Sequence, residues 1–138
     1  MKPQLAAYIQ SDKISFIYKD FVLPGQGHRP RNQWAAEAAQ CAADQGKYWA
    51  YHDHLFNFQK AWTKDELKKY AKDLGLNTTE FNQCFDSGKH TETVNKMTDE
   101  AMNLKLEGTP SIFINGKQVD LNAFASNPAA MIEAELKK

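Results

Sequence analysis

Cysteine is scarce in this 138-residue chain, and its two cysteines, Cys41 and Cys84, stand far apart in the sequence. No C-x-x-C pair occurs, so the usual dithiol redox motif is missing. A zinc knuckle also needs closely spaced cysteine pairs and is excluded for the same reason. The cysteine pattern alone therefore predicts neither dithiol exchange nor a metal centre.

The chain also has no formal net charge, because its 17 basic and 17 acidic side chains cancel. Without a global field the chain would attract neither nucleic acid nor an anionic membrane, and we expect neither as a partner. The apolar runs, such as residues 14–18, are far too short to cross a membrane. Residues 1–20 lack the features of a signal peptide, which at face value predicts a cytoplasmic chain.

Three short segments predict β-structure. Residues 14–21 are rich in aromatic and β-branched side chains, which favours a strand covered on both faces. Residues 111–114 and 117–119 flank Asn115-Gly116, which predicts a β-hairpin. Thr109-Pro110 precedes the hairpin; the residue before a proline is biased towards extended geometry, and X-Pro bonds are where cis peptides occur.

Helical signals dominate the rest of the chain. Capping residues, glycines and apolar periodicity predict helices over residues 5–9, 32–42, 48–59, 63–74, 77–85, 91–106 and 128–138. Asn32 is the expected cap of the second helix, and residues 22–31 read as a loop. In the third helix, Trp49, His52, Leu55 and Phe56 form an expected buried stripe.

Four stretches carry a family resemblance: KISFIYKDFVLPGQGH, AAEAAQCAADQGKYWAYHDHLF, FNQCFDSGKH and LEGTPSIFINGK. In this order they resemble the DsbA-like thiol–disulfide oxidoreductases. The resemblance implies an α/β chain with an incomplete thioredoxin-like fold and an inserted all-helical domain. Residues 1–24 and 107–138 would form the thioredoxin part, residues 32–90 the helical insertion and residues 91–106 a connecting helix.

The same resemblance implies a substrate-binding role for Thr109 and Pro110. In the family this loop lies against the redox cysteines and pairs with an extended, cysteine-containing peptide or protein substrate. The chain departs from the family by lacking the first strand and the C-x-x-C, so it would not carry out dithiol exchange alone. We expect a truncated homologue, periplasmic or extracytoplasmic in its full-length form; the alternative is a non-catalytic peptide-binding or assembly module that keeps the cis-proline groove.

Loss of the first strand has a structural consequence. In the family this strand is central, between the strands expected at residues 14–21 and 111–114, and its absence leaves two inner edges unpaired. The two strands could close up on each other, another chain could supply a strand, or the domain would be unstable. Strand exchange between two copies would give a domain-swapped homodimer.

Relatives also suggest a structural disulfide between Cys41 and Cys84, with two buried thiols or a redox role as the alternatives. His52 and His54 are two residues apart, so on a helix they diverge and cannot share one ion. His28 or His90 could complete a metal site only if the tertiary fold happened to bring ligands together. We therefore expect no metal and no cofactor.

Overall fold

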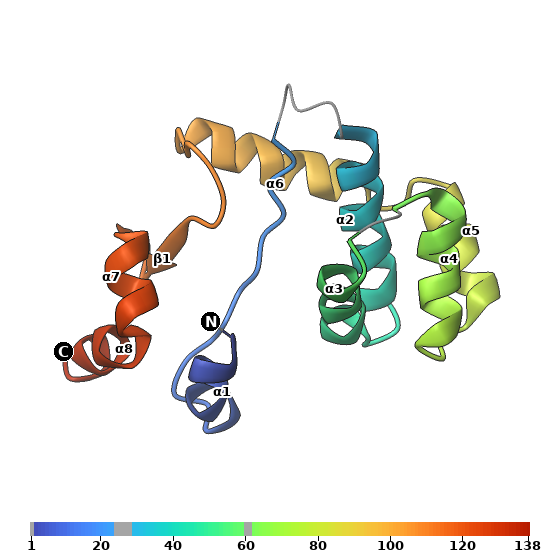
Figure 1. Ribbon diagram of the computed structural model, residues 1–138. Coiled ribbons are helices and arrows are strands. Elements are labelled where there is room, and N and C mark those ends of the chain that lie inside the picture. Colours follow the sequence, from blue (N-terminus) through green and yellow to red (C-terminus); the bar gives the residue numbers. More distant parts are fainter. Residues whose placement is uncertain (1, 24–28, 60–61) are drawn as a thin grey trace. The chain divides into compact units, whose positions relative to one another are not determined.

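The computed structural model describes residues 2–23, 29–59 and 62–138. Over these residues the chain forms eight helices and two short strands (Figure 1). It divides into two compact units, one made of Met1–Lys19 with Leu106–Lys138 and the other of Asp20–Lys105. The chain thus begins in the first unit, builds the second, and returns to complete the first.

The second unit is helical. Its elements are α2 (Arg29–Ala43), α3 (Tyr48–Asn57), α4 (Lys64–Asp73), α5 (Thr78–Asp86) and α6 (Thr91–Asn103). Helix α2 contacts each of the other four helices. Its alanines make this possible, because Ala35, Ala38, Ala39 and Ala42 are all buried and their small side chains allow neighbouring helices to approach closely.

Two of the capping signals in this unit are confirmed. The Thr63 hydroxyl accepts a hydrogen bond from the Glu66 N–H at 3.2 Å, which starts α4. The Asn77 side chain accepts from the Glu80 N–H at 3.1 Å and starts α5 in the same way. Each cap pairs a backbone donor that a helix N-terminus would otherwise leave without an internal partner.

One expectation for the helical unit is wrong, and the buried stripe expected in α3 is confirmed at Leu55 but not at Phe56. Helix α2 begins at Arg29 rather than after Asn32, so Asn32 lies inside the helix and is not its cap. In α3 the buried residues are Tyr51 and Leu55, whereas the Phe56 side chain is 56% exposed. The i, i+4 pair faces the core, and Phe56 packs instead against the His52 ring, with the ring centroids 4.7 Å apart. Most of the loop expected before α2, residues 24–28 with His28, lies outside the described residues.

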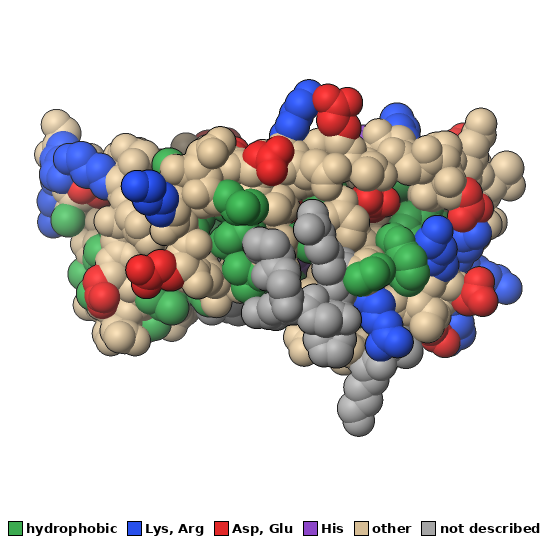
Figure 2. All heavy atoms as spheres, turned by 90° about the horizontal axis from the view of Figure 1, so that it is seen from above, with side chains coloured by type: hydrophobic (Ala, Val, Ile, Leu, Met, Phe, Trp, Pro, Cys, Tyr) green, Lys and Arg blue, Asp and Glu red, His purple; other side chains and the backbone are tan. Residues whose placement is uncertain are grey.

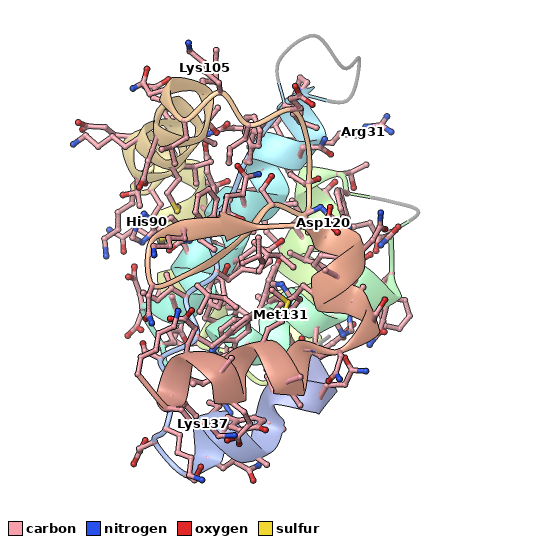
Figure 3. All side chains as sticks on the ribbon, turned by 90° about the vertical axis from the view of Figure 1, so that its left-hand side faces the viewer. Arg31, His90, Lys105, Asp120, Met131 and Lys137 are labelled. Atoms are coloured by element: carbon pink, nitrogen blue, oxygen red, sulfur yellow. A yellow bond between two sulfur atoms is a disulfide. The ribbon has the colours of Figure 1, made fainter. Side chains whose placement is uncertain are left out.

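The first unit contains α1 (Lys2–Gln10), β1 (Ile112–Ile114), β2 (Lys117–Val119), α7 (Leu121–Ser126) and α8 (Pro128–Leu136). Buried Leu5, Phe124 and Ile132 form its core, against which Met131, labelled in Figure 3, also packs. Helix α7 was not predicted, although Asp120 is a local signal for it. The Asp120 carboxylate accepts from the Ala123 N–H at 2.8 Å and caps the helix.

The predicted hairpin is confirmed. Strands β1 and β2 pair antiparallel, with Ile112 opposite Val119 and Ile114 opposite Lys117. Asn115 and Gly116 turn the chain with φ of 48° and 79°, the left-handed geometry that a two-residue type I′ turn requires.

The strand predicted over residues 14–21 is wrong: the described part of the chain has no strand there. Ile14 and Phe16 still pack against the core of the first unit, while Ile17 is 73% exposed. The physical reason is that a strand exists only when its backbone pairs with a neighbour, and the sheet consists of β1 and β2 alone among the described residues. The two segments therefore do not close up into one sheet.

The charges on the surface reflect the equal numbers of acidic and basic residues in the chain. Acidic and basic side chains are interspersed over the face shown in Figure 2. Among the described residues, no helix is both long enough and apolar enough to cross a lipid bilayer.

Candidate functional site

A turn at residues 108–111 leads into β1 and contains Thr109 and Pro110, the predicted substrate-binding residues. The Thr109–Pro110 peptide bond is cis, and both residues are exposed. The Ser111 hydroxyl donates a hydrogen bond of 2.7 Å to the Gly108 carbonyl oxygen and so fastens the two ends of the turn. Thr109 and Pro110 are therefore presented at the surface, directly before the strand.

Strand β1 has two edges, and the hairpin uses only one. In a two-residue hairpin the residues next to the turn exchange hydrogen bonds, and the following pair does not. Ile112 and Ile114 therefore direct their backbone groups to β2. The N–H and C=O of Phe113 point away from β2, to the side that we call the open edge of β1.

No described residue extends the sheet beyond the open edge. The two faces of β1 differ as well, because Ile112 and Ile114 pack against the core while the Phe113 side chain is 38% exposed. An edge with unpaired backbone groups and an exposed aromatic side chain is a template for an incoming extended strand.

The far end of the hairpin is fastened to α8. The Asn115 side-chain amide donates to Glu135 at 3.3 Å, and Lys138 also bonds to the Glu135 carboxylate. The hydrogen bond from Lys138, with a smaller contribution from Asn115, holds the pKa of Glu135 below its usual value despite some desolvation. The turn of the hairpin is thus tied to a helix, which supports β1 without using its open edge.

The two cysteines belong to the helical unit, not to the turn. Cys41 on α2 and Cys84 on α5 form a disulfide with a Cα–Cα distance of 5.9 Å, so the chain contains no free thiol. Both residues are buried. The disulfide links two helices across 43 residues of sequence, an arrangement suited to holding the unit together.

The two neighbouring histidines of α3 have separate surroundings. His52 Nδ1 lies 3.1 Å from the Asp53 carboxylate, whereas the His54 ring packs against Phe58 and Tyr70. They do not form a shared ligand set. The resemblance predicts an unpaired inner edge on the strand at residues 111–114, and the register of the hairpin adds which backbone groups lie on that edge.

One family model and curated relatives with two different names match the chain. A family model described as thioredoxin matches residues 1–134. The chain is 32% identical over 107 residues to a Na(+)/H(+) antiporter NhaA of Herminiimonas arsenicoxydans, covering 78% of this chain and 17% of that protein. It is 29% identical over 119 residues to a "Putative protein-disulfide oxidoreductase" of Rickettsia typhi, covering 82% of this chain and 42% of that protein.

A protein of the same name from Rickettsia bellii is 27% identical over 133 residues, or 92% of this chain and 49% of that protein. The chain therefore spans less than half the length of these curated relatives. No solved structure matches the chain.

Proposed function

The chain belongs to the thioredoxin family, and on this premise we propose that it is a DsbA-like homologue of the thiol–disulfide oxidoreductases that binds an extended polypeptide along the open edge of β1. The observation that carries the proposal is the hairpin register, which turns the backbone of Phe113 away from β2 at the end of the exposed Thr109-Pro110 turn. The relatives named as protein-disulfide oxidoreductases support the oxidoreductase lineage in this proposal.

The proposed architecture is an incomplete thioredoxin-like fold with an inserted helical domain. Its support is the order of the two units, since the helical unit of Asp20–Lys105 interrupts the unit that holds the hairpin. In this scheme residues 32–90 are the insertion and α6 is the connecting helix. The open edge of β1 would then lie where the fold places a central strand.

The proposed role is binding without dithiol exchange by this chain. Exchange requires a thiolate that attacks a disulfide and a second thiol that resolves the mixed disulfide. Both cysteines here are buried and bonded to each other, and they are not spaced as C-x-x-C. The chain would therefore position a substrate segment while the reacting thiols come from another polypeptide segment.

The proposed partner is an extended, cysteine-containing peptide or protein segment. Extended peptides bind to sheet edges through main-chain hydrogen bonds, and side-chain contacts add specificity. Phe113 offers both the outward backbone groups and an exposed ring. An extracytoplasmic location, such as the periplasm, fits this role, because structural disulfides such as Cys41–Cys84 persist in oxidising compartments.

The direct experiment is a fluorescence-anisotropy titration of a labelled, extended, cysteine-containing peptide with the full chain. We expect saturable binding that Pro110→Ala weakens by about 10-fold, because this residue borders the binding edge. Pro30→Ala is the matched control, since Pro30 is also exposed but lies at the start of α2 in the other unit. Absence of binding, or equal weakening by both variants, would contradict the proposal.

A second candidate function is an assembly module in which the open edge binds a second copy. The supporting observation is that every copy carries the same edge, so two β1 strands could pair antiparallel around a twofold axis. Light scattering after gel filtration, over a range of protein concentrations, distinguishes this candidate. A concentration-dependent dimer that Phe113→Pro abolishes would support it, and a monomer at all concentrations would contradict it.

A further inference from the structure

Three helical elements bring a set of potential metal ligands together beside the disulfide. Cys41 lies on α2 and Cys84 on α5. His90, labelled in Figure 3, directly precedes α6. The two sulfur atoms and a ring nitrogen of His90 all lie within 4.8 Å of one another. The cysteines are buried and the His90 side chain is only 16% exposed.

A carboxylate and an ammonium group border this set. The Asp44 Oδ2 atom lies 2.9 Å from His90 Nε2 and accepts a hydrogen bond of 2.7 Å from Lys89 Nζ. The same oxygen lies 3.7 Å from Cys84 Sγ; since a disulfide sulfur carries no proton, this is a contact and not a hydrogen bond. On one side, the disulfide therefore lies next to a histidine ring and a carboxylate, two groups that are common at metal sites.

The Asp44 carboxylate contacts His90 and Lys89 through the same oxygen atom. With Nε2 held by Asp44, Nδ1 would be the nitrogen that binds the ion, and a carboxylate on the other ring nitrogen is the usual device that orients a metal-binding histidine. Lys89 in turn balances one of the negative charges that two thiolates and Asp44 would bring.

We propose that the chain, once its disulfide is reduced, binds one zinc-type divalent ion through Cys41, Cys84 and His90, with Asp44 as the positioning residue. Thiolate sulfur and imidazole nitrogen are the ligands that zinc prefers, at about 2.3 Å and about 2.0–2.1 Å. Ligand atoms around such an ion stand roughly 3.5–3.8 Å apart, so the two sulfur atoms, 2.03 Å apart in the disulfide, would separate on reduction while His90 already lies within 4.8 Å of both. A solvent molecule would complete the four-coordinate site.

The reduction step needs an external reductant. With a water-soluble phosphine, the phosphorus takes an oxygen atom from water and becomes the phosphine oxide. The two electrons it loses break the sulfur–sulfur bond, and the two protons of that water are carried by the resulting thiols. Zinc then replaces both thiol protons and binds the two thiolates. The disulfide and the metal site are therefore alternative states of the same two cysteines.

Sequence patterns do not reveal this site. The cysteines are 43 residues apart, and His90 follows Cys84 by six positions, so no short ligand motif is present. The ligands converge because α2 packs against α5, and α6 begins shortly after α5 ends.

The test is metal titration of the full chain after anaerobic reduction with the phosphine and removal of the reductant. Cobalt(II) serves as the optical probe, and zinc is then titrated against a chromogenic chelator. We expect one ion per reduced chain, a thiolate-to-cobalt charge-transfer band, and no binding by the oxidised chain. His90→Ala should weaken binding by at least about 10-fold, Asp44→Asn by about 10-fold, and His90→Cys should retain tetrahedral cobalt spectra.

His54→Ala is the matched control, because His54 lies on α3 among aromatic rings and should leave the affinity unchanged. Far-UV circular dichroism reports whether the reduced chain stays folded. If reduction unfolds it, zinc must restore the helical signal. The inference is overturned if the reduced chain binds no ion, if His90→Ala and His54→Ala bind equally, or if zinc fails to restore a fold lost on reduction.

Discussion

Phe113 and Gln118 lie opposite each other across the β1–β2 hairpin, and each turns its backbone N–H and C=O outwards. The Phe113 groups face the open edge of β1, and the Gln118 groups face the outer edge of β2. The two residues are therefore a natural matched pair, because a change at either one leaves the hydrogen bonds of the hairpin in place.

Proline substitutions at these two positions test the two edges of the hairpin independently. Phe113→Pro removes the N–H that the open edge offers, and we expect peptide affinity to fall by at least about 10-fold. Gln118→Pro removes an equivalent N–H from the other edge and should leave affinity within about twofold. Proline is tolerated at edge positions where the N–H faces solvent, so both variants should fold. Anisotropy titration of both variants makes the comparison, and an equal effect of the two would contradict it.

Removal of the disulfide should destabilise the chain strongly. Cys41→Ala combined with Cys84→Ala frees a loop spanning 43 residues in the unfolded state, which corresponds to about 4 kcal/mol of unfolding free energy. Urea denaturation in the presence of a chelator measures this loss. Phosphine reduction of the unmodified chain should give a similar loss, and a change below about 1 kcal/mol in both cases would show that the disulfide has little structural role.

Tyr51→Phe should cost about 1 kcal/mol of unfolding free energy. The Tyr51 hydroxyl is buried and donates a hydrogen bond of 2.7 Å to the Leu67 carbonyl, joining α3 to α4. Tyr70→Phe is the comparison, because its hydroxyl makes a longer, partly buried bond of 3.2 Å to the Phe58 carbonyl. Thermal and urea denaturation should rank Tyr51→Phe as the more damaging change; the reverse ranking would be inconsistent with the packing.

The partly buried carboxyl of Asp20 predicts a pH dependence of stability. Desolvation raises its pKa, an effect partly offset by a hydrogen bond from Gln40 and by the charge of His52. A raised folded-state pKa contributes stability below the ordinary value near 4, and this contribution is lost as the pH rises through the raised pKa. Relative to Asp20→Asn, the unmodified chain should therefore lose stability over that interval. Urea midpoints measured from acidic to neutral pH check this, and a pH-independent difference would contradict it.

Local signals in the sequence were reliable where one backbone interaction decides the outcome. Thr63 and Asn77 each cap a helix through an N–H only three residues away, and Asn115-Gly116 suffices to set a turn. The strand predicted at residues 14–21 is absent because a segment with high β-propensity forms a strand only when another strand pairs with it. The cluster of Cys41, Cys84 and His90 could not be predicted from the sequence, because it depends on how three helical elements pack.

Amide hydrogen exchange of the hairpin, measured by NMR with and without the extended cysteine-containing peptide, tests the proposed binding edge most directly. In the free chain the Ile112 and Ile114 amides, which face β2, should be protected, and the Phe113 amide should exchange rapidly. Saturating peptide should slow exchange at Phe113 by at least about 10-fold and leave Gln118 unchanged. Rapid exchange at Phe113 in the presence of bound peptide would contradict binding along the open edge.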